Sequence, residues 1–300
     1  MTEQIVPNDN PVPWGEGVFL GNFESNSPEW HALRAGGNIG GSDVSTICGV
    51  NPWESPFSLW AKKTGKIPES FEPNEAMEWG SRLENVIMDK FFDEHPELWL
   101  YRSPGTFRNV VRAWQIANPD GIYKTESGEF GIVEIKTARY EDDWLHGVPA
   151  YYKTQVQWYM HTFGFKHAYV AVLFSGSKYK EFEVHADEFE QASNLEQVIQ
   201  FRDYVLTEQQ PDYDGALATY ETVRKLHPDI EDDDLELGEL GTHYLLAVTE
   251  ADMADRHLTE MKSRVLDSMG KAKRGLINGV VRVTRQARGT GAPYLVNKKG

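Results

Sequence analysis

The 300-residue sequence predicts an α/β fold, in which helices flank a central sheet and a helical and hairpin appendage follows toward the C-terminal end. Apolar residues make up 40% of the chain, which is enough for a large hydrophobic core. Segments with helical periodicity alternate with short apolar strands in the order helix, strand, strand, helix, strand, strand, helix. We expect an irregular N-terminal segment at 1–27, a core at 28–206, an acidic linker or excursion at 207–240, and a helical and basic C-terminal region at 241–300.

The first part of the predicted core is helical. Ser27 is placed to cap a short helix that opens on a proline. The Gly-rich stretch "GGSDVSTICGV" leads into a second helix, with Ser42 or Asp43 as its N-cap. Gly65 is a predicted stop for the third helix, and regularly spaced apolar residues predict a long amphipathic fourth helix. These four helices are predicted at 27–36, 40–50, 55–65 and 74–92.

Strands and helices then alternate. Two apolar segments, at 106–117 and 130–136, predict a hairpin with "TESGE" as its turn. The alternating "YKEFEVH" predicts an edge strand that pairs with the apolar strand "HAYVAVLFSG" before it. Helices are predicted at 149–163 and 187–206, one or two helices at 239–270, and a final strand at 279–287.

Cysteine content and the absence of targeting signals limit the class of protein. Cys48 is the single cysteine, so a disulfide framework within the chain and a Cys-ligated zinc or iron–sulfur site are excluded. No basic and apolar signal-peptide pattern opens the sequence, and no run of 18 apolar residues occurs. We therefore expect a cytoplasmic protein without a membrane partner. The nine His are scattered, and we interpret each as an ordinary core or surface residue.

Charge is distributed unevenly along the chain. The net charge is −16, which on its own argues against a nucleic-acid partner. Residues 262–300, however, hold ten Lys or Arg against one Asp, which leaves −25 on residues 1–261. A carboxylate-rich body could hold metal ions and a basic tail could hold a polyanion. A solvated acidic surface with a basic tail accounts for the charge equally well.

Three charged residues stand where the pattern predicts buried strands. Glu134 and Lys136 interrupt the apolar run "GIVEIKTA", and side chains two apart on a strand point to the same face. Asp120 follows a proline fourteen residues before Glu134, and a hairpin turn at Ser127–Gly128 would bring it to that face. Buried charges destabilise a fold unless they are paired. The group therefore indicates either a site or a salt bridge on an edge strand.

Metal-assisted phosphodiester hydrolysis is the chemistry that suits two carboxylates and one ammonium. Mg²⁺ binds oxygen ligands, and the Ile135 backbone carbonyl could add another. Lys136 could orient or deprotonate the attacking water, or hold the phosphate. Glu84 lies at the margin of the apolar stripe of helix 74–92, where it could face such a site or solvent. Tyr152, Gln155 and Tyr159 share one helical face and could form a polar row beside the metal, or an ordinary amphipathic face.

The combined series Glu84, Pro119-Asp120, Glu134-Ile135-Lys136 and Gln155-x3-Tyr159 resembles the PD-(D/E)XK nuclease superfamily. Within it, the chain is similar to the phage lambda-type exonucleases and the YqaJ-type viral recombinase nucleases. The stretches "EWHALRAGGNIGGSDVSTICGVNPW" and "MEWGSRLENVI" carry the same likeness, which covers residues 28–205. The resemblance implies a restriction-endonuclease-like core with a mixed central sheet.

The resemblance also implies roles for individual residues. Metal ligation falls to Asp120, Glu134, the Ile135 carbonyl and Glu84, with Lys136 as the catalytic lysine and Gln155 beside it. Tyr152 and Tyr159 would support them. Arg34 and Ser42 match positions that grip the 5′ phosphate of a DNA end in lambda-type exonucleases.

The activity implied by the resemblance is digestion of double-stranded DNA from its 5′ ends with Mg²⁺, or alternatively Mn²⁺. The 3′ single strand left behind would pass to a single-strand annealing protein, in the cytoplasm of a bacterium or a phage-infected bacterium. Several relatives form ring-shaped oligomers around DNA, and a trimer would match them. An endonuclease, or a non-catalytic DNA- or protein-binding module on the same core, remains an alternative. The basic C-terminal end could be a DNA clamp or an oligomer contact.

Overall fold

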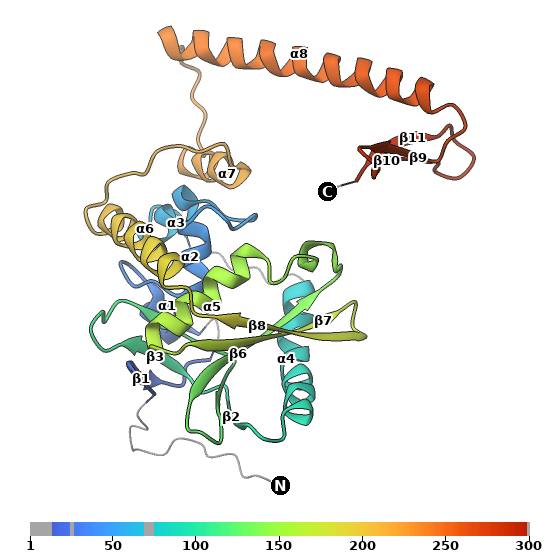
Figure 1. The fold of residues 1–300 in the computed structure, drawn as a ribbon. Helices are drawn as coiled ribbons and strands as arrows, with labels where there is room; N and C mark the ends of the chain where they lie inside the picture. The colour runs from blue at the N-terminus through green and yellow to red at the C-terminus, as the bar shows by residue number, and fades with distance from the viewer. Residues whose placement is uncertain (1–13, 25–26, 69–74, 299–300) are drawn as a thin grey trace. The chain divides into compact units, whose positions relative to one another are not determined.

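The computed structural model describes residues 14–24, 27–68 and 75–298, and the chain divides into two units at Asp229/Ile230. The first unit contains the central sheet and the helices around it (Figure 1). The second unit contains one long helix and a small sheet.

A five-stranded mixed sheet forms the centre of the first unit, in the order β2-β5-β6-β7-β8. Strands β6 and β7 are parallel, whereas the other neighbours are antiparallel. Helix α5 connects the two parallel strands, as a parallel pair requires. The predicted mixed sheet is confirmed. Its strands are β2 (Trp99–Arg102), β5 (Gly121–Lys124), β6 (Phe130–Ala138), β7 (His167–Phe174) and β8 (Lys178–His185).

Helices cover both faces of this sheet (Figure 1). Helix α4 packs on one face, where Phe91 and its neighbours meet Val133 and Ile135 of β6 in a small buried cluster. Helix α5 packs on the other face, where Ile132 joins the larger core. Since side chains alternate along a strand, Glu134 lies on the α5 face. The helices of this unit are α1 (Pro28–Arg34), α2 (Gly41–Ile47), α3 (Pro56–Lys63), α4 (Glu75–Glu94), α5 (Ala150–Phe163), α6 (Glu188–Leu206), α7 (Leu217–Leu226) and the short η1 (Asp142–Trp144).

The helix starts follow the capping prediction with one correction. Ser27 accepts a hydrogen bond from Trp30 N at 3.2 Å at the start of α1, as predicted. At α2 the N-cap is Gly40, not Ser42 or Asp43. Asp43 stands at the third helical position and accepts from Gly40 N at 2.9 Å, so its carboxylate caps from inside the helix.

The segment predicted as one strand at 106–117 forms two strands instead. These are β3 (Thr106–Asn109) and β4 (Ile116–Ala117), which pair in a separate sheet with β1 (Gly17–Gly21). Buried Asn109 accepts hydrogen bonds from the backbone N–H groups of Val111 and Arg112, both at 3.0 Å. The prediction that 106–117 pairs with the strand at 130–136 is therefore wrong, and the hairpin with its turn at Ser127–Gly128 forms between β5 and β6. Residues 1–27 were predicted to be irregular, but they contain strand β1. Residues 1–13 and 25–26 of this segment lie outside the described residues.

The expected linker at 207–240 contains a packed helix. Thr219 of α7 donates to Ser55 Oγ at 2.7 Å, at the N-cap of α3. Both hydroxyls are buried, so this part of the segment belongs to the first unit. The predicted boundaries of the four regions otherwise stay a prediction.

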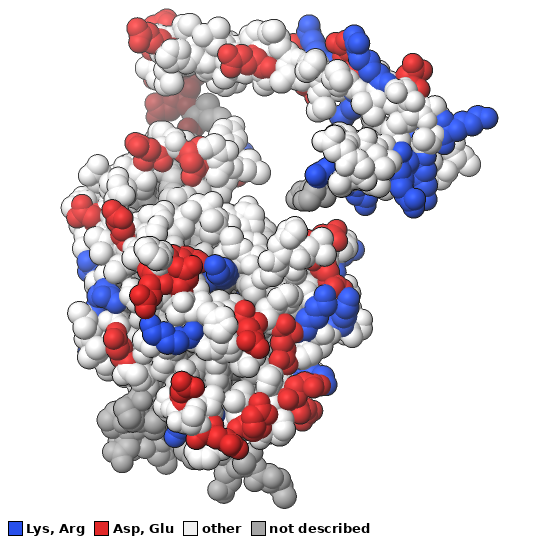
Figure 2. Space-filling view, viewed as in Figure 1, with Lys and Arg blue, Asp and Glu red and all other residues white. Residues whose placement is uncertain are grey.

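The second unit is an exposed helix followed by a small antiparallel sheet. The region predicted as one or two helices is a single helix, α8 (Gly238–Met269). All residues of α8 are described, and none of them is buried. The predicted strand near 279–287 is β10 (Val280–Gln286), paired with β9 (Arg274–Ile277) and β11 (Tyr294–Asn297), so it is not the last strand. Lys and Arg gather over this sheet (Figure 2). Of the helices that the structure describes, none is long and apolar enough to cross a membrane.

Candidate active site

The hairpin of β5 and β6 brings the predicted acidic residues together. Gly121 pairs with Val133, so Asp120 stands beside Glu134 at the start of β5. Asp120 Oδ2 accepts a hydrogen bond from Ile135 N at 2.7 Å. The carboxylate is therefore held against the β6 backbone next to the glutamate, as the hairpin geometry predicts.

Glu134 is the most deeply buried group of the set, with only 2% of its surface exposed. Its Oε1 atom accepts from Lys136 Nζ at 2.6 Å and from Gln155 Nε2 at 2.7 Å. Its Oε2 atom is buried and has no hydrogen-bond partner among the described residues. A buried carboxylate oxygen without a partner is costly, and a bound cation would relieve that cost.

A cleft of about 690 Å³ opens over this group. Glu84 of α4 and Asp120 line it together with Ile135 and Lys136. Tyr152 of α5 lines the same cleft, and its ring lies 4.8 Å from Lys136 Nζ. Helices α4 and α5 and the second half of β6 thus all line the same cleft. Other lining residues, which the sequence did not single out, include Trp53, Ser81 and Thr137.

The electrostatics of the cleft favour an added positive charge. Burial raises the pKa of Glu134 to about 8, and the neighbouring Asp120 acts in the same direction, while Lys136 opposes both. Burial and Asp120 likewise raise the pKa of Glu84 to about 7. Burial also raises the pKa of Asp120. Burial disfavours the Lys136 ammonium, but Glu134 and Asp120 outweigh it and raise the pKa of Lys136, so the lysine stays charged.

Three carboxyl groups beside one lysine are the kind of donor set that a hard divalent ion prefers. Asp120, Glu134 and Glu84 offer oxygen ligands of the kind that Mg²⁺ and Mn²⁺ prefer. Gln155 also contacts Tyr159, with its Nε2 atom 3.0 Å from the hydroxyl oxygen. The structure thus brings together the predicted ligands, the lysine and all three members of the polar row of α5.

The second predicted group, Arg34 and Ser42, is also assembled. Arg34 Nη2 donates to Ser42 Oγ at 2.5 Å, and the guanidinium carbon lies 4.4 Å from the centre of the Trp30 ring. A Cβ atom on Gly40 would come within 2.7 Å of Arg34 Nη2, so glycine leaves the space that the guanidinium fills. The Arg34 side chain is 12% exposed, and Ser42 is exposed, so an anion could reach the pair.

Asp43 and Lys63 contact the Arg34–Ser42 pair and were not predicted as part of it. Lys63 Nζ lies 3.0 Å from Asp43 Oδ2 and donates to the Arg34 carbonyl at 2.8 Å. Asp43 also lies 3.4 Å from Arg34 Nη2. Although burial alone would raise it, the pKa of Asp43 is lowered by Lys63 and Arg34, so the carboxylate stays charged. The "GGSD" turn in the sequence indicates a capping role for Asp43, but no residue near Lys63 in the sequence indicates that it contacts Asp43.

Gly41 lies between the Arg34–Ser42 pair and the residues around Glu134, in close contact with α5. A Cβ atom at this position would lie 2.5 Å from Tyr159 Cε1 and 3.0 Å from Gln155 Cγ. Only a residue without a side chain lets the first turn of α2 approach α5 this closely. The Ser42 hydroxyl is thereby one residue away from backbone that touches Tyr159 and Gln155, and Gln155 donates to Glu134.

The chain is similar to several known sequences and solved structures. A family model described as the YqaJ-like viral recombinase domain matches residues 29–166. The uncharacterized protein YqaJ of Bacillus subtilis is 32% identical over 274 residues, which cover 87% of this chain and 83% of that protein. Protein D345L of African swine fever virus is 26% identical over 163 residues, 47% of this chain and 46% of that protein. An alkaline exonuclease from Laribacter hongkongensis shares the fold, with 19% identity, a TM-score of 0.50, and coverage of 68% of this chain and 100% of its own.

Proposed function

Because the chain belongs to the YqaJ-like viral recombinase family, we propose that it is a Mg²⁺-dependent exonuclease acting on linear double-stranded DNA. It would degrade the strand that carries the 5′ end and leave a 3′ single-stranded tail for phage-type recombination. A single-strand annealing protein would take up that tail, in the cytoplasm of a bacterium or a phage-infected bacterium. A ring-shaped homo-oligomer, such as a trimer, is part of the proposal.

The observation that carries the proposal is the buried Glu134 carboxylate beside Asp120. A salt bridge with Lys136 would need only one carboxylate, and it would not leave Glu134 Oε2 buried without a partner. Asp120, Glu134, Glu84 and the Ile135 carbonyl would hold Mg²⁺. When bound, the ion would supply a water of lowered pKa and stabilise charge on the phosphate.

Lys136 and Gln155 have distinct tasks in this proposal. The Lys136 ammonium, 2.6 Å from Glu134 Oε1, would orient the attacking water or the phosphate as a point charge. Gln155 holds the same carboxylate oxygen through its amide and is itself fixed by Tyr159. Such preorganisation keeps the reacting groups aligned without reorganisation during the reaction.

Arg34 and Ser42 would bind the 5′-terminal phosphate. A guanidinium and a hydroxyl are both donors, and a phosphate oxygen accepts from both. An enzyme that cuts internal bonds has no terminal phosphate to bind. This pair therefore favours an exonuclease over an endonuclease.

The test uses linear duplex DNA with a 5′ phosphate on one end and a 5′ hydroxyl on the other, beside a closed circular plasmid. The wild type and Glu134→Gln are compared in Mg²⁺, in Mn²⁺ and in EDTA. We expect metal-dependent loss from the phosphorylated 5′ end, an intact circle and an inactive variant. Cleavage of the circle would point to the endonuclease. DNA binding without cleavage in either metal would leave a binding module and refute the proposal.

A further inference from the structure

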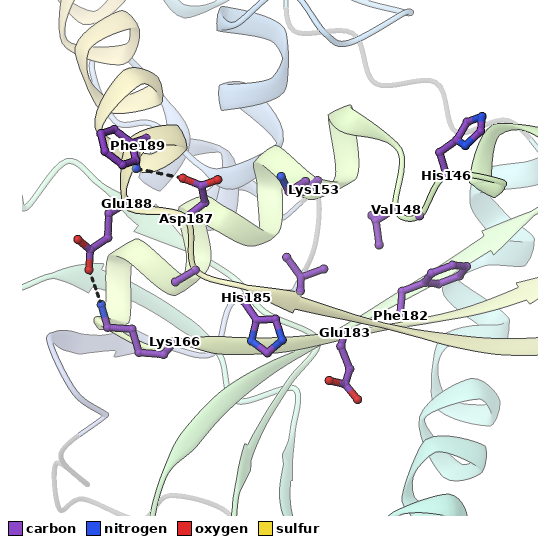
Figure 3. Close-up of a pocket in the computed structure, with 13 residues that line it drawn as sticks. His146, Val148, Lys153, Lys166, Phe182, Glu183, His185, Asp187, Glu188 and Phe189 are labelled. Carbon is purple, nitrogen blue, oxygen red and sulfur yellow. Dashed lines mark hydrogen bonds and ion pairs between the residues drawn. The ribbon is translucent and has the colours of Figure 1, made fainter.

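A second group of metal-binding side chains lies at the edge of the central sheet. His167 opens β7 and His185 ends β8, and the two are direct partners in the antiparallel ladder. Glu183 stands two residues before His185, so it shares the same face of the sheet. Figure 3 shows Glu183 and His185 projecting from one side of β8, with Phe182 on the opposite side.

The three side chains converge on one point. One ligand atom from each of His167, Glu183 and His185 lies within 4.8 Å of the others. The His167 Nε2 atom is 3.5 Å from a Glu183 carboxylate oxygen, and the two imidazole centres are 5.0 Å apart. Within the described part of the chain, no other group of three His, Cys, Asp or Glu side chains comes this close together.

The surroundings hold this group in place. The Tyr123 hydroxyl forms a short hydrogen bond with His167 Nδ1, which leaves the Nε2 atom directed toward Glu183. The buried amide of Gln157 donates to the His185 carbonyl at 2.7 Å and accepts from the backbone beyond it. A hydrogen bond on the second nitrogen of an imidazole is the usual support for a metal-binding histidine.

We propose that His167, Glu183 and His185 bind a divalent transition-metal ion of the Zn²⁺ class. Two imidazole nitrogens and one carboxylate are a ligand set that Zn²⁺ accepts, with water in a fourth position. Mg²⁺ prefers oxygen ligands throughout, so it would not compete well for this group. The site therefore differs in ion from the Glu134 cleft.

Strand β8 lies at the edge of the sheet, and the ion would fasten it to β7. His167 belongs to one strand, whereas Glu183 and His185 belong to the other. An ion that binds only when both strands are paired stabilises the folded chain by mass action. The inference does not rest on the proposed nuclease activity, because binding and thermal stability report on it directly.

The experiment titrates the full chain with Zn²⁺ by calorimetry and with Co²⁺ by visible absorption, in excess Mg²⁺ to occupy the oxygen site. His185→Ala and Glu183→Gln test the ligands. His146→Ala is the matched control, because His146 is an exposed histidine in the loop before α5. We expect one tight Zn²⁺ per chain, a Co²⁺ band typical of nitrogen ligands, and a higher melting temperature with Zn²⁺.

The ligand variants should lose these properties, and the control should keep them. Affinity for Zn²⁺ should fall by more than about tenfold in both ligand variants, and Tyr123→Phe should weaken it by about tenfold through the lost hydrogen bond. Glu183 is exposed, so its exchange for Gln leaves the fold intact and keeps the test informative even if His185→Ala misfolds. Absence of Zn²⁺ binding in excess Mg²⁺, or equal binding by the wild type and Glu183→Gln, would overturn the proposal.

Discussion

Two ion pairs of the chain have the same length and opposite surroundings. Lys136 Nζ lies 2.6 Å from Glu134 in the central sheet, and their side chains are 16% and 2% exposed. Arg264 Nη2 lies 2.6 Å from Glu260 on α8, and their side chains are 71% and 55% exposed. Water and salt screen the second pair, whereas the first interacts in a medium of low dielectric constant. Burial rather than distance therefore decides what a charge can do in this protein.

The buried pair also has neighbours that the exposed pair lacks. Asp120 and Glu84 line the cleft beside Glu134, and each raises the pKa of the glutamate. On α8 the pair is a simple i,i+4 contact along one helix. Three carboxyl groups beside a single lysine leave the cleft short of positive charge, whereas the two charges of the surface pair neutralise each other in the surrounding water.

The largest expected difference between the pairs is in activity. Glu134→Gln keeps the shape of the side chain and removes the charge that would hold the metal. We expect the rate of DNA digestion to fall by about 10³-fold or more, since the variant loses a metal ligand and the partner of Lys136. Glu260→Gln, the matched change on α8, should leave the rate unchanged. Equal effects of both changes in an exonuclease assay would show that burial gives Glu134 no special role.

The next effect concerns Arg34 in the proposed 5′-phosphate site. Arg34→Ala should lower the rate on a 5′-phosphorylated end by about 10- to 100-fold, as expected for a lost hydrogen bond to a charged group. The rate on a 5′-hydroxyl end should change little. Arg34→Lys should restore part of the preference, because an ammonium keeps the charge without the planar fork. The ratio of rates on the two ends measures the effect, and an unchanged ratio in Arg34→Ala would exclude phosphate binding at this residue.

Burial of Glu134 should also make the stability of the protein depend on pH. In EDTA, the protonated Glu134 stabilises the folded state fully below pH 4.5, its ordinary pKa, and that contribution is lost as pH rises to about 8. Glu134→Gln should therefore gain stability relative to the wild type across this window. Melting temperatures of both proteins, recorded from pH 5 to about 8, give the difference. A difference independent of pH would mean that Glu134 ionises normally.

The smallest effect is expected at the exposed pair. Arg264→Ala should lower the free energy of unfolding by about 0.3 to 0.5 kcal/mol, the usual worth of an i,i+4 pair on a helix. Added salt should reduce the difference further. Denaturant unfolding at low and high salt measures it. A loss of several kcal/mol would show that α8 is covered in solution and that the pair is not exposed.

Much of the fold could be predicted because its helices and strands carry clear periodic patterns. The long helix at α4, the hairpin turn before β6 and the edge strand β8 follow from apolar spacing and turn residues. The prediction of one strand at 106–117 failed because the turn between β3 and β4 depends on a single side chain, Asn109, that accepts hydrogen bonds from the backbone. Short strands such as β1 and β2 are fixed by partners far away in the chain, and no local pattern marks them.

The candidate site was predictable where residues are close in sequence or match a family motif. Glu134 and Lys136 share a strand face by simple alternation. Lys63, by contrast, meets Asp43 only after two helices pack together. His167 and His185 meet through the register of two strands, and scattered histidines in a sequence give no such register. The catalytic and metal-binding roles of the predicted residues stay a prediction.

Gly41 fixes how far the proposed 5′-phosphate pocket lies from the proposed site of hydrolysis. The backbone of α2 touches the side chains of Tyr159 and Gln155 there, with no flexible side chain between them. If the chain is an exonuclease, this contact holds the 5′-phosphate pocket at a constant distance from the site of hydrolysis. The distance between the terminal phosphate and the bond to be cut would be the same in every cycle. Such an enzyme advances along DNA in equal steps and releases products of a single length.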